Sequence, residues 1–296
     1  MVTRYQQSPP KPLMSAGSRT AEKDCTEPES TEPLRFSVVV PAYNEEMYLG
    51  DCLASLAAQD FEGSLEIIVV DNNSTDGTAE LARRAGVTVL REPRPGVCQA
   101  RQLGTAAARG TIVVSTDADT TFSSNWLSQI DRAFRNNPRC VAVAGPAYFL
   151  DGPLWGLWIQ KALFGLVGIL KRRAGRVIYI SATNVAFHKS MWTGYDVRLT
   201  QGGDELDLLR RLQSRGEVLF DMTNPTTTSA RRMEQGVAYN LIVSFFYHYL
   251  LGYALNRMFG RRILGMAPPF RRPNPGRTGG GKVGPSVRRR ARLQIR

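Results

Sequence analysis

The sequence predicts an α/β fold, a mostly parallel sheet with helices on both faces. Short apolar runs suited to buried strands recur at residues 36–40, 65–70, 87–90 and 111–115, and helical stretches separate them. A polar segment follows each of these runs. Strands that alternate with helices form a parallel sheet, and such sheets bind ligands at the carboxyl ends of their strands. We therefore expect these polar segments to meet along one edge of the sheet.

The elements follow one another in a regular order. FSVVV is followed by PAYNEE and then by a helix expected over 46–59, where Leu49, Leu53 and Leu56 fall on one face. LEIIVV is followed by DNNSTDGT, where Asp76 is expected to cap the next helix. VTVL precedes REPRPG, and TIVVS precedes the acidic segment TDADT. No internal repeat is visible.

The positive charge is concentrated at the C-terminus. The formal net charge is +12, and residues 271–296 contain nine Lys or Arg and no acidic residue. A basic tail attracts phosphates, but no aromatic residue follows Arg271 to stack on bases, so nucleic acid is not an expected partner. The cysteines form no CxxC pair, which argues against a disulfide framework or a zinc site and fits a reducing compartment.

Composition divides the chain into four parts. Residues 1–34 are rich in Pro, Ser, Thr and Glu, lack the apolar core of a signal peptide, and are expected to form a disordered leader. Residues 35–232 are expected to form the α/β domain, including an apolar helix at 154–170. Residues 233–267 are expected to form an apolar, membrane-associated helix, and residues 268–296 a basic, disordered tail rich in Pro, Gly and Arg.

The acidic segment poses an electrostatic question. Asp117 and Asp119 stand two residues apart directly after an apolar strand. Neighbouring carboxylates repel each other, so either a positive charge lies between them or one of them is protonated. A purely structural alternative is that Asp117 caps the following turn while Asp119 is solvated.

Several motifs in order give the chain a family resemblance. VVVPAYNEE, IIVVDNNSTDGT, ARQLGTAAARG and TDADT, followed by SATNVAFHKSMWTGYDVRLTQGGDELDLLRR, resemble the family 2 glycosyltransferases with the GT-A fold. The resemblance covers about residues 36–232. It implies an inverting enzyme that uses a nucleotide-diphosphate sugar and a divalent metal, Mg²⁺ or Mn²⁺. UDP is the favoured nucleotide.

The resemblance also implies donor-binding roles for particular residues. Asp117 and Asp119 correspond to the family's DxD motif, whose first Asp often serves the ribose and whose second binds the metal; their hard oxygens suit Mg²⁺ or Mn²⁺. The first loop, Pro41, Ala42, Tyr43 and Glu45, would lie against base and ribose. Asp71 would accept a hydrogen bond from the base, with a local Asx-turn as the alternative or an addition.

Two arginines near the third loop are phosphate candidates. Arg94 and Arg101 flank PGVCQA, and a guanidinium pairs with phosphate in bidentate fashion. A solvated helix face is an equal alternative for both. Near the end of the domain, SARR takes the place of the QxxRW motif of processive relatives but lacks its Gln and Trp, which weakens a polymerising role. Arg231 or Arg232 could still meet the diphosphate.

The catalytic base is expected in GGDELDLLRR. By the resemblance it is Glu205, but the order here is Asp then Glu, so Asp204 stays a serious alternative. Asn184 could line the sugar pocket or be a buried structural residue. His188 and His248 are lone histidines expected to be structural.

Two apolar stretches, 154–170 and 237–255, raise the question of a membrane. A single crossing within the first would separate Asp119 from Glu205, which must share one site. A single crossing within the second would place the basic tail outside, against the positive-inside rule. We therefore expect peripheral attachment on the cytoplasmic side, by interfacial helices and the basic tail. Buried helices of a soluble cytoplasmic protein, or a hairpin dipping into the membrane, are the alternatives.

The leading function is transfer of a sugar to an envelope, lipid-linked or glycan acceptor. A polyprenyl-phosphate glycosyl transferase of the dolichol-phosphate-mannose-synthase type is an alternative within the same family resemblance. A nucleotidyltransferase would need a Gly- and Arg/Lys-rich loop after the first strand, which PAYNEE lacks. A non-catalytic scaffold that binds membrane or nucleic acid is the alternative from a different class.

Overall fold

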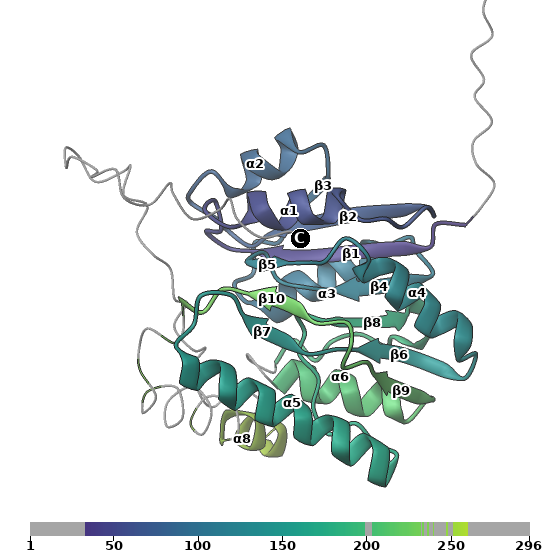
Figure 1. Cartoon of the computed structure of the whole chain (residues 1–296). Coiled ribbons are helices and arrows are strands. Elements are labelled where there is room, and N and C mark those ends of the chain that lie inside the picture. The colour runs from purple at the N-terminus through teal and green to yellow at the C-terminus, as the bar shows by residue number, and fades with distance from the viewer. Residues whose placement is uncertain are drawn as a thin grey trace, which may run out of the picture. The chain divides into compact units, whose positions relative to one another are not determined.

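The computed structural model describes residues 33–198, 203–231, 233, 236, 239, 247 and 251–259. These residues contain a seven-stranded sheet of order β3-β2-β1-β4-β8-β6-β9 (Figure 1). Its strands are β1 (Phe36–Ala42), β2 (Leu65–Asp71), β3 (Thr88–Arg91), β4 (Ile112–Ser115), β6 (Cys140–Ala144), β8 (Val185–His188) and β9 (Glu217–Phe220). Only β8 runs antiparallel to its neighbours in this described sheet. The predicted α/β fold with a mostly parallel sheet is therefore confirmed.

Helices cover both faces of this sheet. Val38 and Val39 of β1 are both fully buried, and they point into two different hydrophobic clusters because side chains alternate along a strand. The first cluster includes side chains from α1 (Leu49–Ala57), α2 (Thr78–Arg84) and α4 (Trp126–Asn136). The second includes side chains from α3 (Val97–Ala107), α5 (Leu154–Ala174) and α6 (Gly203–Gln213).

A small second sheet joins segments that are far apart in the sequence. It has the order β5-β10-β7, formed by β5 (Thr120–Thr121), β7 (Ala147–Phe149) and β10 (Thr226–Thr228). Thr228 of β10 pairs with Thr120 of β5 in antiparallel register. This pairing brings the residues after β10 beside the acidic segment after β4 (Figure 1).

Two helices differ in length from the sequence prediction. α1 begins at Leu49 rather than at 46, because side chains of the next loop hold the residues before it: the backbone N–H of Glu45 donates to Thr78 Oγ1 at 2.8 Å. α5 continues to Ala174, past the expected end at 170. Its last turn is basic, which favours a helix C-terminus, and Gly175 then stops the helix in a left-handed conformation with φ 68°.

The remaining described elements are the 3₁₀ helix η1 (Lys189–Met191) and α8 (Gly252–Phe259). Of the predicted apolar segment 233–267, only α8 and a few single residues are described. The predicted leader, apart from Pro33 and Leu34, and the predicted tail lie outside the described residues. Among the described helices, α5 alone is long and apolar enough to cross a membrane, and 22% of its most apolar window is buried.

Candidate active site

Polar side chains gather at the carboxyl ends of β1, β2 and β4. Ala42 ends β1 and Asp71 ends β2, and the two are register partners. Pro41, Ala42 and Asp71 are buried, whereas Tyr43 is partly exposed. Asp117 follows β4 at the same edge because β1 and β4 are parallel neighbours. The loops that the sequence places after these strands therefore meet along one edge.

Arg101 joins this edge to α6. Its Nη2 donates to Asp117 Oδ1 at 2.8 Å, and its Nη1 donates to Asp204 Oδ2 at 2.7 Å. Asp204 lies in the first turn of α6 and has no exposed side-chain surface, whereas 36% of the Asp117 side chain is exposed. The guanidinium thus brings the DxD segment and the predicted base segment into one site.

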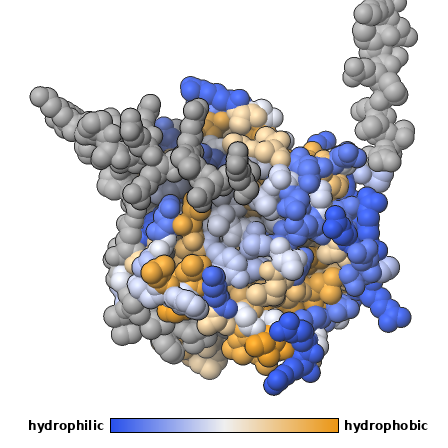
Figure 2. Space-filling view, viewed as in Figure 1, coloured by the Kyte–Doolittle hydropathy of each residue, from blue (hydrophilic) through white to orange (hydrophobic). Residues whose placement is uncertain are grey.

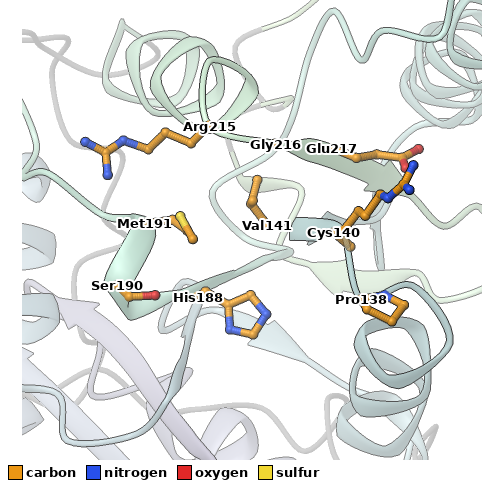
Figure 3. Close-up of a pocket in the computed structure, with 10 residues that line it drawn as sticks. Pro138, Cys140, Val141, His188, Ser190, Met191, Arg215, Gly216 and Glu217 are labelled. Carbon is orange, nitrogen blue, oxygen red and sulfur yellow. The ribbon is translucent and has the colours of Figure 1, made fainter.

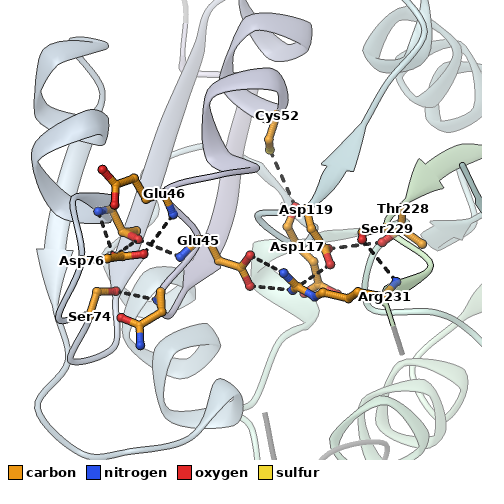
Figure 4. Close-up of polar contacts among 12 residues, drawn as sticks. Glu45, Glu46, Cys52, Ser74, Asp76, Asp117, Asp119, Thr228, Ser229 and Arg231 are labelled. Atoms are coloured by element: carbon orange, nitrogen blue, oxygen red, sulfur yellow. Dashed lines mark hydrogen bonds and ion pairs between the residues drawn. The ribbon is translucent and has the colours of Figure 1, made fainter. Parts of the chain in front are cut away.

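Arg231 makes a second junction of the same kind. Its two terminal nitrogens donate to the two carboxylate oxygens of Glu45, each at 2.7 Å, and its Nη2 lies 2.8 Å from Asp119 Oδ2 (Figure 4). The guanidinium also lies 4.9 Å from the centre of the Tyr48 ring. Arg231 therefore ties the loop after β1 to the second aspartate of the DxD segment.

Asp119 has further partners that sequence reasoning missed. Thr228 Oγ1 donates to Asp119 Oδ1 at 3.2 Å, and the backbone N–H of Ser229 donates to Asp119 O at 3.1 Å (Figure 4). Both residues come from the end of β10 and reach Asp119 through the β5–β10 pairing. The sequence signal for this strand was the run of three threonines before SARR. Such a short run can be recognised as a strand only once the strand that it pairs with, β5, is known.

Glu205 differs from its neighbour Asp204. It is partly buried, and its Oε1 accepts a hydrogen bond of 3.0 Å from the backbone N–H of Ala182. Burial, followed by the nearby charge of Asp204, raises the pKa of the Glu205 carboxyl above its usual range. Arg101 opposes this rise. A carboxyl whose pKa is raised in this way is suited to take up a proton near neutral pH.

The acidic segment also fits a divalent metal. No three His, Cys, Asp or Glu side chains among the described residues are grouped closely enough to hold a metal by themselves. Asp117 and Asp119 offer hard carboxylate oxygens, and Mg²⁺ is typically held by one or two carboxylates together with substrate phosphates. The donor set therefore fits a metal that is shared with a bound diphosphate.

The loops after β2 and β3 are each held by their own hydrogen bonds. Asp71 Oδ1 accepts from the backbone N–H of Ser74 at 3.1 Å, which is the local turn that the sequence allowed. Arg94 donates to both carboxylate oxygens of Glu92, at 2.8 and 2.9 Å. Arg94 precedes α3, so it lies in a loop rather than on the helix face offered as an alternative.

Asn184 lies among protein partners. Its Nδ2 donates to the backbone oxygens of Pro146 and Asn224, and its Oδ1 accepts from Trp126 Nε1 at 3.0 Å. The side chain is 3% exposed. Both amide hydrogens and the oxygen are thus engaged, which favours the structural alternative over a sugar contact.

The remaining candidates lie outside the carboxylate cluster. His188 ends β8 and packs edge-on against Phe134, and burial lowers its pKa. Asp76 accepts from the backbone N–H of Thr78, but the residue in the N-cap position of α2 is Gly77, one later than predicted. Arg232 and His248 lie outside the described residues.

In the part of the chain that the structure describes, two of the hollows bear on the position of the site. The larger, about 580 Å³, is lined by the starts of β6 and β9 and by His188 at the end of antiparallel β8 (Figure 3). It therefore opens at the opposite edge of the sheet from the carboxylates. The smaller, about 410 Å³, is lined by Tyr48, Trp155, Ser229 and Arg231 among others, and so borders the cluster.

The fold is a mostly parallel α/β sheet with carboxylates along one edge, and comparison with known proteins gives the family. The family model "Glycosyl transferase family 2" matches residues 37–192, more than half of the chain. The chain therefore belongs to glycosyl transferase family 2.

A relative and two solved structures are similar to this chain. An uncharacterized glycosyltransferase of Mycobacterium tuberculosis is 42% identical over 94 residues, which are 32% of this chain and 41% of the relative. The match thus spans about two fifths of the relative's length.

The structures are a mannosyltransferase from Pyrobaculum calidifontis in complex with GDP-Man and Mn²⁺ and a glucosyl-3-phosphoglycerate synthase from M. tuberculosis in complex with Mn²⁺, UDP-glucose and phosphoglyceric acid. The first has a TM-score of 0.53 and 22% identity, with 67% of this chain and 58% of that chain covered. The second has a TM-score of 0.52 and 21% identity, with 68% and 74% covered. At these identities the likeness shows the shared fold.

Proposed function

We propose that this glycosyltransferase is a metal-dependent, inverting enzyme that moves a sugar from a nucleotide-diphosphate donor, with UDP favoured, to an acceptor hydroxyl or phosphate. One observation carries the proposal: Arg101 brings Asp117 and Asp204 into one site, at 2.8 and 2.7 Å from its guanidinium nitrogens. The DxD carboxylates and the α6 carboxylates are thus neighbours, as a single displacement reaction requires.

The donor end of the site would be formed by the first, second and fourth loops. Asp71 would accept a hydrogen bond from the base, and Pro41, Ala42 and Tyr43 would lie against base and ribose. Asp119, with Asp117, would hold Mg²⁺ or Mn²⁺, which when bound stabilises the charge on the leaving diphosphate. The complexes of the two structural neighbours with nucleotide sugars and Mn²⁺ support this assignment.

The acceptor end would be served by Glu205. Its carboxylate takes the proton of the acceptor hydroxyl, whose oxygen attacks the anomeric carbon as the bond to the diphosphate breaks. Asp204 is the poorer candidate, because its side chain has no exposed surface and is bound to Arg101. We therefore assign Asp204 the role of positioning Arg101, and Glu205 the role of base.

Calorimetric titration with UDP and with GDP, each with and without Mn²⁺, tests the donor proposal. Wild type should bind one nucleotide more tightly in Mn²⁺, and Asp119→Ala should lose that metal dependence while remaining folded. Thr228→Val is a matched control, because it removes a hydrogen bond to Asp119 but leaves the carboxylate in place. A folded wild-type protein that binds neither nucleotide would favour the scaffold alternative.

We further propose that the enzyme attaches peripherally to a membrane through α5. Apolar side chains on this helix are exposed, among them Leu154 at 76%, Trp158 at 71% and Leu166 at 49%. The helix ends in Lys171, Arg172 and Arg173, and Figure 2 shows apolar residues over α5 with hydrophilic ones at this end. An apolar stripe ending in cations matches an anionic lipid surface on the cytoplasmic side.

This location favours an envelope or lipid-linked acceptor, including a polyprenyl phosphate. Co-sedimentation with vesicles tests it. Wild type should bind vesicles containing anionic phosphatidylglycerol more than vesicles of phosphatidylcholine, and Trp158→Gln should bind both less. Met47→Gln is a control, since Met47 is another exposed apolar residue (50%) but lies outside α5. Equal binding by wild type and W158Q would remove α5 from the proposal.

A further inference from the structure

Arg231 occupies one carboxylate oxygen of Asp119, the residue proposed to bind the metal. Its Nη2 lies 2.8 Å from Asp119 Oδ2, and the same guanidinium is bound in bidentate fashion by Glu45. The exposed fractions of the three side chains are 8% for Arg231, 5% for Glu45 and 12% for Asp119. We propose that Arg231 is a resident counter-ion of Asp119, which leaves this carboxylate when a metal and a diphosphate arrive together.

Charge explains why the two ligands would have to arrive together. Glu45, Asp119 and Arg231 carry one net negative charge. A free divalent cation reaching Asp119 would meet a carboxylate already paired with a guanidinium, and separating the pair would leave that guanidinium in a largely buried place without one of its partners. A diphosphate supplies the missing anion, because guanidinium groups bind phosphate oxygens as well as they bind carboxylates.

The surroundings of Arg231 give it room to turn. Arg231 lines the hollow of about 410 Å³ next to the cluster, together with Tyr48 and Trp155. Glu45 keeps its place through the hydrogen bond from its backbone N–H to Thr78 Oγ1. The guanidinium can therefore shift from Asp119 toward a ligand while Glu45 and the Tyr48 ring still hold it from the other side.

The consequence is a coupling between metal and nucleotide. Metal alone binds weakly because Arg231 competes for Asp119, and diphosphate alone binds weakly because Arg231 is held by two carboxylates. Each ligand removes the obstacle to the other, so the two affinities rise by the same factor. The inference rests on the proposed nucleotide-diphosphate donor, and Arg231 acts in it as a residue that binds the diphosphate.

The first test is binding of Mn²⁺ alone, by calorimetry or by electron paramagnetic resonance of the free ion. Arg231→Gln should bind Mn²⁺ about tenfold more tightly than wild type, within the range usual for coupled sites. The double variant E45Q/R231Q replaces the buried ion pair by two amides and keeps the test valid if R231Q is unstable. Arg109→Gln is the matched control, since Arg109 binds Glu66 near the start of β2 and should leave Mn²⁺ affinity unchanged.

The second test is the factor by which Mn²⁺ strengthens binding of UDP. It should be large in wild type and in R109Q, and should fall by about tenfold in R231Q. Unchanged or weaker Mn²⁺ binding in R231Q and in E45Q/R231Q would overturn the inference. This outcome differs from failure of the proposed function, in which wild type binds no nucleotide at all, because the Mn²⁺ titration requires no nucleotide.

Discussion

Two arginines divide the carboxylates of the site between them, and their surroundings differ. Arg101 lies in α3, and its partner Asp204 has no exposed side-chain surface. Arg231 follows β10, stacks on Tyr48 and borders a hollow of about 410 Å³. The two arginines nevertheless make the same kind of contact, since each binds one DxD aspartate and one carboxylate from another element of the fold.

The difference shows that similar ion pairs can have different roles, one structural and one in ligand binding. A guanidinium that is buried together with a fully buried carboxylate has no space in which to move. Arg101 therefore holds α6 in place against β4. A guanidinium beside a hollow can exchange one anion for another, so Arg231 can respond to a ligand. Burial of the partner and free space nearby, rather than the number of contacts, separate a fixed link from an exchangeable one.

The largest effect is expected at Glu205, the proposed base, which is next to the Arg101 partner Asp204. Glu205→Gln should lower turnover by about 10²–10⁴-fold, because loss of a general base typically has this effect. Nucleotide affinity should stay near the wild-type value, because Glu205 is placed at the acceptor end. Sugar transfer to a lipid-extract acceptor, measured beside UDP binding, checks both. Unchanged turnover would transfer the role of base to Asp204.

A smaller effect separates the two arginines by stability. Arg101→Gln leaves buried Asp204 without its counter-charge and should cost about 3–5 kcal/mol of the free energy of unfolding. Mn²⁺ should recover little of this loss, because the uncompensated Asp204 carboxylate is buried and is not a proposed metal ligand. Arg231→Gln should also be less stable than wild type, but Mn²⁺ should recover a larger part of its loss, because the carboxylate left without its arginine is the proposed metal ligand Asp119, and a ligand that binds the folded state more tightly stabilises it more.

Urea unfolding with and without Mn²⁺ measures the contrast between R101Q and R231Q. An equal response of the two variants to Mn²⁺ would break the distinction between a fixed and an exchangeable arginine. Arg109→Gln again serves as the control, since Arg109 is 75% exposed and remote from the metal site.

A substitution at Asp71 tests the proposed base contact separately from Arg101 and Arg231. Asp71→Asn keeps an oxygen for the turn with Ser74 but removes the carboxylate proposed to meet the base. UDP affinity should fall by about tenfold, equivalent to about 1.4 kcal/mol, while Mn²⁺ affinity stays the same. Calorimetry on D71N and wild type measures both. A loss of Mn²⁺ binding in D71N would show that the donor loops are not independent of the metal site.

The smallest expected effect is a shift of the pH profile. Glu205 must be deprotonated to act as a base, so turnover should rise with pH through its raised pKa. The charge of Asp204 contributes to that rise in pKa, so Asp204→Asn should lower the pKa and move the increase in turnover to lower pH. Rate profiles of folded D204N and wild type test the sign. A shift toward higher pH would contradict the conclusion that the charge of Asp204 raises the pKa of Glu205.

The first half of the sheet could be predicted from sequence because its signals are local. The apolar runs at 36–40, 65–70, 87–90 and 111–115 correspond to β1 to β4, with ends that differ by a residue or two. Buried parallel strands are apolar along their whole length, so a short stretch of sequence identifies them. The loops after these strands then had to share one edge.

The later strands carry weaker signals. β5 and β10 consist of two and three threonines and form only because they pair with each other and with β7. The site residues Thr228 and Ser229 were therefore missed. Tyr48 was missed for another reason, because its contact with Arg231 joins segments far apart in the sequence. Asn184 could be placed at the edge of the sheet, but only the positions of Pro146, Asn224 and Trp126 decide that its amide is structural.

The sequence by itself determined the α/β fold, the order of the polar loops and the residue types that the chemistry needs. These features can be predicted because the spacing of apolar residues within a segment indicates whether that segment forms a strand or a helix. Only the tertiary structure decided that Arg101 binds Asp117 and Asp204, and that Arg231 binds Glu45 and Asp119. The strength of a charge pair depends on distance and burial, and both are set by residues far away in the chain.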